Sequence, residues 1–415
     1  MKRYETYKDS GIQWWEEIPT HWDLKKAKHM FSLVTENVSN PSLPKVALEN
    51  IESWTGRFIE TDSDFMGEGV EFKKNDILFG KLRPYLAKVY KADFAGQAVG
   101  DIYVFRGNEE QVPEYLKYLL LSYPFISVVD GSTYGAKMPR ANWDFISHLV
   151  LPCPPQSEQF AIAAFLDHKV GQIDAAIAEK EQMLEDLKAY RSAIISEAVT
   201  KGLDKKVEMK DSGIEWCGYI PIHWQVLKIG YIFQNLDHLR QPISSENRER
   251  NNPQYEYYGA SGVIDKIDSY NVNDKVLLIG EDGANLVSRT LPLIYKAEGK
   301  FWVNNHAHIL KPISSDYDYM AFLLETADYT NYITGSAQPK LSQEKLSSVK
   351  LPVPPIEEQK QIAEKLSCIV PLIDRSLIEI EKIIEDLKSY KSALITEAVT
   401  GKIDLREWKP NEENV

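Results

Sequence analysis

Three segments of this chain occur twice in the same order, and this internal repeat constrains the fold more than any other feature. The segment KDSGIQWWEEIPTHW (residues 8–22) returns as KDSGIEWCGYIPIHW (210–224), at an offset of 202 residues. Two more pairs share an offset of 200: LPCPPQSEQ (151–159) with LPVPPIEEQ (351–359), and EDLKAYRSAIISEAVT (185–200) with EDLKSYKSALITEAVT (385–400). Chance does not produce three long matches in one order, so the chain contains two copies of one structural unit.

The sequence between the repeated segments does not repeat. Residues 23–148 and 225–348 share almost no sequence. Matched segments that enclose two unmatched inserts predict a pseudo-twofold scaffold on which each insert performs its own version of one task. Two different recognition modules on a symmetric scaffold would suit a target that is bipartite and asymmetric.

The segment after each insert is typical of a long helix. A proline pair (154–155 and 354–355) ends the preceding extended segment, and apolar residues then recur in steps of four and three. The heptad stripe lasts about five heptads, and Gly202 and Gly401 mark the helix ends. We expect helices over 158–199 and 358–399, each about 40 residues or 60 Å long, that pack antiparallel. The stripe consists of Ile162, Leu166, Val170, Ile173, Ile177, Lys180, Leu184, Leu187, Arg191, Ile194 and Ala198, and of Ile362, Leu366, Val370, Ile373, Leu377, Ile380, Ile384, Leu387, Lys391, Leu394 and Ala398.

Two basic residues interrupt this apolar stripe. Arg191 and Lys391 occupy equivalent positions of the predicted seam between the helices. Their long side chains could reach solvent, which is the more ordinary interpretation. Alternatively, they mark a place where the seam opens or meets another subunit.

The inserts have the pattern of mixed α/β domains. ILFGKLRPYLAKVY (77–90) begins as a strand, KVLLIGEDGANLV (275–287) is a strand that enters a glycine-containing turn, and short helices are expected near PEYLKYLLLS and DYMAFLLET. We therefore predict an α/β (α+β) fold: two target-recognition domains joined by two long antiparallel coiled-coil helices, with a pseudo-twofold internal repeat. The predicted boundaries are 1–150 for domain 1, 151–205 for the central helix, 206–350 for domain 2, and 351–415 for the distal helix and tail.

Composition excludes several classes of protein. We find no apolar run near the 18 residues that a membrane span requires, and the opening MKRYETYKDSG is unlike a signal peptide, so a cytoplasmic location is expected. The three cysteines are far apart and form no CxxC pair, which indicates neither a disulfide framework nor a zinc cluster. The net charge of −13 opposes nucleic-acid binding, since phosphate contacts need Lys and Arg. DNA binding would need local basic patches or a partner that supplies part of the neutralisation.

The repeated motifs resemble those of a known family. IPxHW (18–22 and 220–224), LPxPPxxEQ before a long helix, and the duplication itself are similar to the specificity subunits of type I restriction–modification systems, over nearly the whole chain. GKLRPYLxKV in the first insert, and GEDGANL followed by WVNNHAHIL in the second, also resemble segments of family members.

The resemblance implies a function and partners. It implies two recognition domains at opposite ends of a two-helix spacer, each of which recognises half of a split double-stranded DNA site. It further implies that two methyltransferase (modification) subunits dock on this scaffold and methylate adenines with S-adenosylmethionine that they bind themselves. Restriction/translocase subunits would join them. The modification subunits would share the phosphate contacts, which would account for the shortage of basic residues.

Signatures of catalysis are missing from the sequence. There is no P-loop and no GxGxxG motif. Asn252-Pro253-Gln254-Tyr255 is only faintly like the NPPY loop of adenine methyltransferases. Asn304-Asn305-His306-Ala307-His308 could bind a metal, but no third ligand stands at a suitable spacing, so a structural role or a polar DNA contact is favoured. Glu281 and Asp282 favour a turn beside Gly283, although a carboxylate could accept a hydrogen bond from a cytosine amino group. We predict a non-catalytic subunit without cofactor or metal.

Candidate DNA-contacting residues are polar or basic side chains on loops, because these match the donors and acceptors of base edges. Trp22 and Trp224 are expected to belong to the scaffold core. The loops GSTYGAKMPRANW and GSAQPKLS precede the two proline pairs at equivalent places, which favours them over ordinary surface loops. The candidates are Lys81, Arg83, Tyr134, Lys137, Arg140, Asn285, Arg289, Asn304, His306, Gln338 and Lys340.

Two other functions and one topological expectation remain. The chain could belong to a self-contained restriction enzyme, but it is too short for nuclease and methyltransferase domains together. It could also be a coiled-coil adaptor without a DNA role. Finally, the segment after the second helix (VTGKIDLREW) would lead into the first repeated motif, so we expect the C-terminal tail to lie beside the N-terminus.

Overall fold

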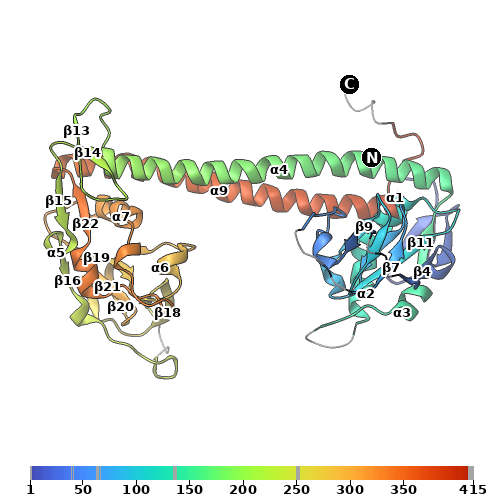
Figure 1. Cartoon of the computed structure of the whole chain (residues 1–415), viewed down its shortest axis with the longest axis horizontal. Coiled ribbons are helices and arrows are strands. Elements are labelled where there is room, and N and C mark those ends of the chain that lie inside the picture. Colours follow the sequence, from blue (N-terminus) through green and yellow to red (C-terminus); the bar gives the residue numbers. More distant parts are fainter. Residues whose placement is uncertain are drawn as a thin grey trace. The chain divides into compact units, whose positions relative to one another are not determined.

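The computed structural model describes residues 2–38, 40, 42–61, 65, 67–133, 138–248 and 253–409, which form two compact units. Unit 1 comprises Met1–Gln182 and Glu381–Val415, and unit 2 comprises Met183–Ile380. Two long helices, α4 (Gln156–Lys201) and α9 (Ile356–Val399), contribute to both units (Figure 1). We call the part of unit 1 before α4 the first domain (residues 2–155) and the part of unit 2 between the long helices the second domain (202–355).

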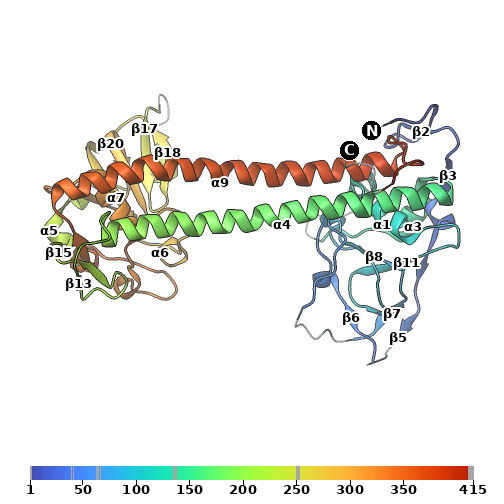
Figure 2. The same cartoon turned by 90° about the horizontal axis from the view of Figure 1, so that it is seen from above.

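Both long helices are present as predicted, and they run antiparallel (Figure 2). In unit 1, Asp174 of α4 pairs with Lys391 of α9, and Glu181 pairs with Lys388, so the residue numbers run in opposite directions. The apolar stripe faces the seam, since Ile162, Leu166, Ile362 and Leu366 are almost fully buried. Gly202 and Gly401 follow the helix ends with a φ of +73° at both, the left-handed conformation that glycine adopts without strain.

The two basic residues in the stripe form ion pairs across the seam. In unit 1, Lys391 pairs with Asp174 at 2.9 Å, with side-chain exposures of 8% and 11%. In unit 2, Arg191 pairs with Asp374 at 2.6 Å, with exposures of 36% and 44%. The expectation that Lys391 reaches solvent is therefore wrong, because a carboxylate on the facing helix compensates its charge inside the seam. Offsets of 200 separate Asp174 from Asp374 and Arg191 from Lys391, so the pair belongs to the repeat.

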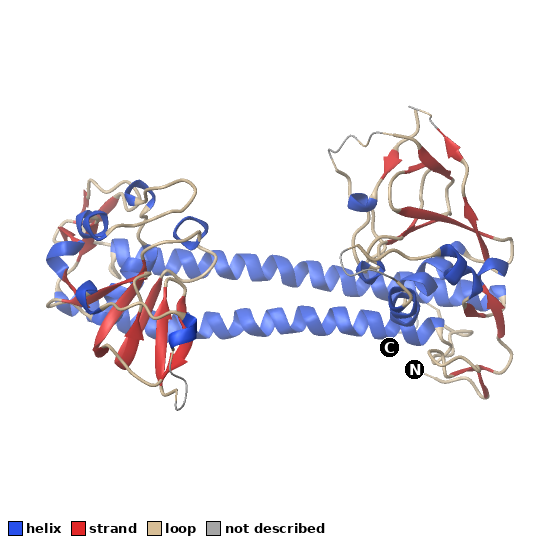
Figure 3. Ribbon diagram, turned by 90° about the horizontal axis from the view of Figure 1, so that it is seen from below, coloured by secondary structure: helices blue, strands red, loops and turns tan. Residues whose placement is uncertain are grey.

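The first domain is built from two four-stranded sheets and three helices (Figure 3). One sheet has the order β4-β11-β8-β9, and the other has the order β5-β7-β10-β6, in which only β10 and β6 are parallel. The strands of the first sheet are β4 (Phe31–Val34), β11 (Ile102–Gly107), β8 (Ile77–Gly80) and β9 (Val89–Lys91). Those of the second are β5 (Asn37–Val38), β7 (Gly69–Phe72), β10 (Gly96–Ala98) and β6 (Lys45–Val46). The helices are α1 (Pro113–Leu121), α2 (Tyr123–Gly131) and α3 (Trp143–His148), and a 3-10 turn, η3 (Pro84–Leu86), follows β8.

The second domain instead gathers its strands into one six-stranded sheet with the order β16-β21-β19-β20-β17-β18. Both domains are mixed α/β as predicted, but the sequence did not reveal this difference in sheet organisation. The strands are β16 (Phe233–Asn235), β21 (Ala307–Pro312), β19 (Val272–Gly280), β20 (Ile294–Val303), β17 (Tyr255–Gly259) and β18 (Gly262–Ile267). The helices are α5 (Ile229–Ile232), α6 (Asn285–Ser288), α7 (Tyr317–Thr326) and α8 (Gln343–Ser348).

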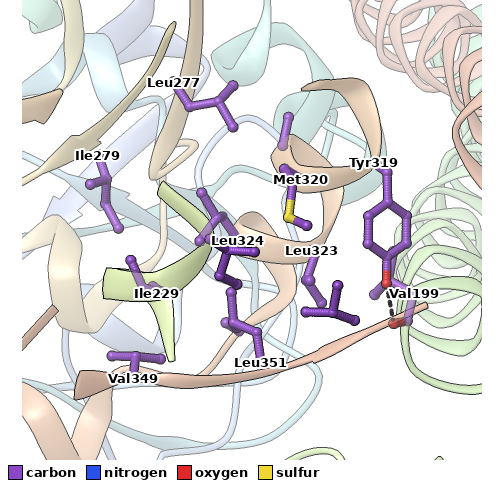
Figure 4. Close-up of a cluster of buried hydrophobic side chains, with 14 of the residues drawn as sticks. Val199, Ile229, Leu277, Ile279, Tyr319, Met320, Leu323, Leu324, Val349 and Leu351 are labelled. Carbon is purple, nitrogen blue, oxygen red and sulfur yellow. Dashed lines mark hydrogen bonds between the residues drawn. The ribbon is translucent and has the colours of Figure 1, made fainter. Parts of the chain in front are cut away.

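The largest core cluster of unit 2 joins the second domain to both long helices (Figure 4). Helix α7 contributes Tyr319, Met320, Leu323 and Leu324, which pack against strand and helix residues of the domain and against α4. The buried Tyr319 hydroxyl donates to the carbonyl of Val199, near the end of α4, at 3.2 Å. The second domain and these parts of the long helices therefore share one hydrophobic core.

Each domain is fastened to a long helix by the same three side chains. The indole N–H of Trp22 donates to Glu158 of α4 at 3.0 Å, and His21 contacts the same carboxylate at 2.6 Å. In unit 2, Trp224 and His223 contact Glu358 of α9 at 3.1 and 2.8 Å. Both tryptophans have no exposed surface, so the prediction that they belong to the scaffold core is confirmed.

Each insert enters and leaves through two adjacent antiparallel strands. β3 (Asp23–Lys26) pairs with β12 (Val150–Cys153), and β15 (Gln225–Lys228) pairs with β22 (Lys350–Val353). Before each pair lies a hairpin, formed by β1 (Tyr7–Asp9) with β2 (Glu17–Pro19), and by β13 (Met209–Asp211) with β14 (Tyr219–Pro221). The repeated segments thus build most of each hairpin, one of the two strands at the neck of each domain, and both ends of the long helices.

The C-terminal tail lies beside the N-terminal segment in unit 1, as predicted. The amide of Asp404 donates to the carbonyl of Lys2 at 2.9 Å, and the hydroxyl of Tyr7 donates to the carbonyl of Gly401 at 3.1 Å. A Cβ on Gly401 would lie 3.0 Å from Trp22, and a Cβ on the equivalent Gly202 would lie 3.2 Å from Trp224, so each glycine follows its helix against a tryptophan. Among the described residues, no helix combines the length and the apolar character that crossing a bilayer requires.

Candidate nucleic-acid interface

Three candidate residues of the first domain lie on one pair of loop segments. After β8, residues 81–83 run alongside residues 139–141, which precede α3. The amide of Arg83 donates to the carbonyl of Pro139, and that of Ala141 donates to the carbonyl of Lys81, both at 2.8 Å. Leu82 and Arg140 form the antiparallel bridge between them. The structure thus brings Arg140 close to Lys81 and Arg83, although Arg140 lies far from them in the sequence.

The second domain contains the same pair of segments at an offset of 200. The amide of Gly283 donates to the carbonyl of Pro339 at 3.0 Å, and that of Leu341 donates to the carbonyl of Glu281 at 2.7 Å. Asp282 and Lys340 form the bridge. We call 81–83 with 139–141, and 281–283 with 339–341, the loop pairs. Their backbones match although the inserts share almost no sequence.

A glycine precedes each loop pair at a position where neighbouring atoms leave little room for a side chain. A Cβ on Gly80 would lie 2.9 Å from Leu48, and a Cβ on Gly280 would lie 2.8 Å from the carbonyl of Ala260. Such distances require neighbouring atoms to move. Strands β8 and β19 therefore end in the same way, and the residue after each glycine begins the loop pair.

In the first domain, one carboxylate holds two of the basic side chains. Arg140 donates to Asp101 through Nε at 3.1 Å and Nη2 at 3.0 Å, and Lys81 lies 3.8 Å from the same carboxylate. The hydrogen bonds that Arg140 donates to Asp101 raise the pKa of Arg140. Half of the Arg140 side chain is exposed, so it is oriented and still accessible.

Arg83 differs from these residues, because it is exposed and its side chain has no partner among the described residues. Its φ is +51°, in the left-handed region, which costs a non-glycine residue about 1 kcal/mol. The equivalent residue of the second domain is a glycine, Gly283, with a φ of +103°. The turn therefore favours glycine, and among the described residues the side chain of Arg83 has no hydrogen bond or ion pair that would offset the strain.

In the second domain, the carboxylate comes from the loop pair itself. Glu281 pairs with Arg240 and lies 3.0 Å from the Nζ of Lys340, whose side chain is 54% exposed. Burial alone would raise the pKa of Glu281, but the hydrogen bonds from Arg240 and Lys340 outweigh it and lower the pKa below its ordinary value. Glu281 and Asp282 stand where the first domain has Lys81 and Leu82, so the two loop pairs differ in charge.

The other candidates of the second domain lie near this loop pair and have structural partners. His306, half exposed, contacts Asp282 at 2.8 Å. Asn304 is buried, and its Oδ1 accepts the amide of His306 at 2.8 Å. The guanidinium of Arg289 donates to the carbonyls of Glu325 and Ala327 at the end of α7. Asn285 donates to the carbonyls of Leu291 and Pro292, which organises the turn after α6.

The remaining candidates divide into exposed and undescribed residues. Gln338 is exposed and immediately precedes the loop segment 339–341. Tyr134 and Lys137 lie outside the described residues, as does Asn252 of the NPQY segment. In the described part of the chain, no group of three or more His, Cys, Asp or Glu is arranged to hold a metal ion. His308 is fully buried, and both of its ring nitrogens have hydrogen-bond partners, so its structural role is confirmed.

Sequence reasoning missed Asp101, Arg240 and Asp237, which orient the basic side chains. A signal for the loop pairs was nevertheless present, because Gly80 and Gly280, and Pro139 and Pro339, obey the same offset of 200 as the repeated helices. No such signal exists for Asp101, because the equivalent residue of the second domain is His306. The two residues are equivalent because the amide of Lys81 donates to the carbonyl of Asp101, and the amide of Glu281 donates to the carbonyl of His306.

Comparisons with known proteins point to one family. The model of the type I restriction modification DNA specificity domain matches residues 221–386. The protein named as type I restriction enzyme MjaX specificity subunit of Methanocaldococcus jannaschii is 24% identical, over 96% of this chain and 98% of that protein. The EcoDI specificity subunit of Escherichia coli is 25% identical over 43% of this chain and 44% of that protein.

Solved structures share the fold. A structure of a type I restriction–modification system, described for its complex assembly and conformational transition, superposes with a TM-score of 0.72 at 16% identity, over 93% of this chain and 99% of that chain. The crystal structure of the HsdS subunit from Thermoanaerobacter tengcongensis gives a TM-score of 0.52 at 17% identity, with coverages of 93% and 98%. Residues 221–386 thus match the type I restriction modification DNA specificity domain, the chain is similar over nearly its whole length to a type I specificity subunit, and the solved structures share its fold.

Proposed function

We propose that each domain recognises one half of a bipartite, asymmetric DNA site through its loop pair. The observation that carries this proposal is that two matching backbones present different side chains. The first loop pair offers the donors Lys81, Arg83 and Arg140, whereas the second offers the acceptor Asp282 together with Lys340. Arg and Lys match guanine, and a carboxylate matches the cytosine amino group, so the two domains would select different sequences.

The strained backbone of Arg83 supports this assignment. Arg83 keeps a strained backbone conformation where glycine would be relaxed, and its guanidinium is exposed and has no partner in the described part of the chain. A residue that costs stability and gains no contact within the described fold fits a role outside the chain. The domains proposed for this function are residues 1–150 and 206–350, with helices at 151–205 and 351–415, and Tyr134 and Lys137 remain proposed contacts.

The test is an exchange of residues 23–148 for the insert of another family member. Because strands β3 and β12 hold the two ends of the insert side by side, we expect the chimera to fold and to change one half of the methylated motif while it keeps the other. Methylome sequencing of a host that expresses the system measures both halves. A change in both halves, or in neither, would refute the assignment of one domain to one half-site.

A residue-level arm of this test uses Arg83→Gly, with Arg375→Ala as the loss of an exposed arginine outside the loop pair. Arg83→Gly should leave the fold at least as stable, since it relieves the strain, and should weaken DNA binding by about 1–3 kcal/mol. A base contact would relax specificity at one position, whereas a phosphate contact would lower affinity for all sequences alike. Undiminished binding would remove Arg83 from the interface.

We propose that the chain itself is non-catalytic and acts in the cytoplasm with modification and restriction subunits. The curated relatives are specificity subunits, and the sequence contains no cofactor-binding glycine motif. Modification subunits would bring S-adenosylmethionine and part of the phosphate neutralisation that a chain with a net charge of −13 needs. Methyl transfer by the purified chain alone, with S-adenosylmethionine and DNA of varied sequence, would contradict this part of the proposal.

The surface that would bind the modification subunits is indicated by the repeat. Exposed positions of the long helices differ between the copies over most of their length, but residues 185–197 and 385–397 retain the same exposed side chains except at Ala189 and Ser389. Tyr190 and Tyr390, 56% and 51% exposed, are the largest of them. Tyr390 also lines a surface cavity of about 580 Å³ with Leu394, Glu397 and Tyr7. Identical exposed residues at two equivalent places suit two copies of one partner.

Tyr390→Ala should reduce the number of bound modification subunits from two to one, since it removes one of two equivalent contacts. Native mass spectrometry of the co-expressed complex measures this stoichiometry. Tyr231→Ala, a truncation of a tyrosine that is 75% exposed outside the repeated segment, is the control and should leave two copies bound. Retention of both copies by Tyr390→Ala and by the double variant Tyr190→Ala/Tyr390→Ala would show that this surface is not the docking site.

A further inference from the structure

Beneath the second loop pair lies a buried network of charged groups. His308 of β21 has no exposed surface, and its Nδ1 lies 2.6 Å from a carboxylate oxygen of Asp237. Its Nε2 lies 2.7 Å from the carbonyl oxygen of Leu341 and 3.9 Å from Glu281. Arg240 contacts both carboxylates, and Lys340 contacts Glu281. Two carboxylates and two basic groups, His308 and Arg240, therefore meet below Lys340, the side chain that we propose as a DNA contact.

The hydrogen bonds of His308 define its protonation. A carbonyl oxygen only accepts, so Nε2 must carry a proton. Asp237 also acts as an acceptor, because its other oxygen receives the amide of Ile309 at 2.8 Å. Burial would raise the pKa of Asp237, but the hydrogen bonds from His308, Ile309 and Asn235 outweigh it and lower the pKa. With an ionised carboxylate at Nδ1 and a carbonyl at Nε2, both ring nitrogens face acceptors, which is the hydrogen-bond pattern of an imidazolium.

The network reaches Lys340 through the backbone as well as through Glu281. The carbonyl of Leu341 accepts from His308, and the amide of Leu341 donates to the carbonyl of Glu281. The amide and carbonyl of Lys340 are both bonded to Thr334, at 2.8 and 2.9 Å. These hydrogen bonds fix the backbone on each side of Lys340, and His308 holds it from the interior of the sheet.

The first domain has the same anchor in another chemical form. Strand pairing makes Ile102 equivalent to Ala307, since they lie opposite Gly80 and Gly280, and Tyr103 is then equivalent to His308. The hydroxyl of Tyr103 donates to the carbonyl of Ala141 at 3.1 Å, and Ala141 is the equivalent of Leu341. Both domains therefore hold the same loop carbonyl from the same strand position, once with a neutral phenol and once with a charged ring.

We propose that Tyr103 and His308 are positioning residues for DNA recognition: each fixes the loop that carries Arg140 or Lys340 through one hydrogen bond to the carbonyl of residue 141 or 341, and His308 does so as an imidazolium. The expected effect of these residues on DNA binding rests on the proposed function of the loop pairs. The protonation of His308 does not depend on DNA, so the two parts can be tested separately.

The first measurement is nitrogen NMR of the full chain with ¹⁵N-labelled histidine at neutral pH. The signals of His308 are those that disappear in His308→Gln. We expect the shifts of two protonated ring nitrogens, since both face acceptors. A shift typical of a bare ring nitrogen would overturn the imidazolium, whatever the chain does with DNA.

The second measurement is binding of the complex with its modification subunits to DNA that carries the methylated motif, and to variants altered in one half-site. Tyr103→Phe, which removes only the hydroxyl, should lower discrimination at the half-site of the first domain about tenfold and leave the other unchanged. His308→Gln should do the reverse. Thermal unfolding confirms that each variant is folded, and Tyr103→Phe keeps the test valid if His308→Gln does not fold.

A double-variant comparison separates positioning from general stability. If Tyr103 acts through Arg140, then Tyr103→Phe should have no further effect in a chain that already carries Arg140→Ala. Full additivity, or an equal loss at both half-sites, would overturn the positioning role. If Arg140→Ala and Lys340→Ala bind and discriminate DNA like the unaltered chain, the proposed function of the loop pairs fails, while the NMR result still decides the state of His308.

Discussion

Asp174→Ala should destabilise unit 1 by about 3–5 kcal/mol, because it leaves Lys391 in the seam without its carboxylate. Lys391 is 8% exposed, so water replaces little of the lost interaction. Asp174 also pairs with Arg57 of the first domain at 2.8 Å, and the substitution removes that contact too. A loss of this size is a large share of the 5–15 kcal/mol that typically stabilises a domain. Urea denaturation followed by circular dichroism measures it.

The repeat supplies a matched control in Asp374→Ala. It removes the equivalent pair with Arg191, whose partners are more than one-third exposed, so we expect a loss of about 1 kcal/mol or less. Lys391→Met should also cost less than Asp174→Ala, because Asp174 keeps Arg57 as a partner. Equal losses for Asp174→Ala and Asp374→Ala would show that burial does not determine the strength of this pair.

Trp224→Ala should destabilise unit 2 by a similar amount, about 3–5 kcal/mol, since it removes a fully buried indole from the junction of domain and helix. The cavity would lie in the core that also contains Val199 and Tyr319, so the junction rather than the domain alone would weaken. Thermal and urea unfolding measure the change.

Trp224→Phe separates the volume of the indole from its N–H group. It keeps a large ring and loses the hydrogen bond to Glu358, so about 1–2 kcal/mol is expected. Tyr231→Ala, at an exposed position, should change stability by less than about 0.5 kcal/mol. If Trp224→Phe proved as damaging as Trp224→Ala, the hydrogen bond rather than packing would dominate the junction.

The scaffold was predictable from the sequence because its constraints are repeated. A heptad stripe, a proline pair and a terminal glycine are local patterns, and each occurs twice, so the long helices and their antiparallel packing followed. The seam ion pairs were not foreseen, since the partner of Lys391 lies on the other helix and only the three-dimensional alignment of the helices selects Asp174.

The interface could be predicted only in part. Lys81, Arg83 and Arg140 were identified as basic loop residues, but their assembly depends on strand pairing between segments that are far apart. The second domain was harder, because its loop pair carries acidic residues where the first has Lys81 and Leu82. Arg289 stays a predicted DNA contact, but the sequence did not reveal that its guanidinium also caps the end of α7.

The narrow necks formed by β3 with β12 and by β15 with β22 have an evolutionary consequence. Each insert begins and ends on neighbouring strands, opposite residues such as Leu24 and Pro152 or Val226 and Pro352, so its two ends meet the scaffold at one point. The tryptophan–glutamate junctions lie outside the inserts and are the same in both repeats. Recombination between genes could therefore exchange a whole insert without altering the scaffold, and new combinations of half-sites could arise in one step rather than by gradual change of each contact.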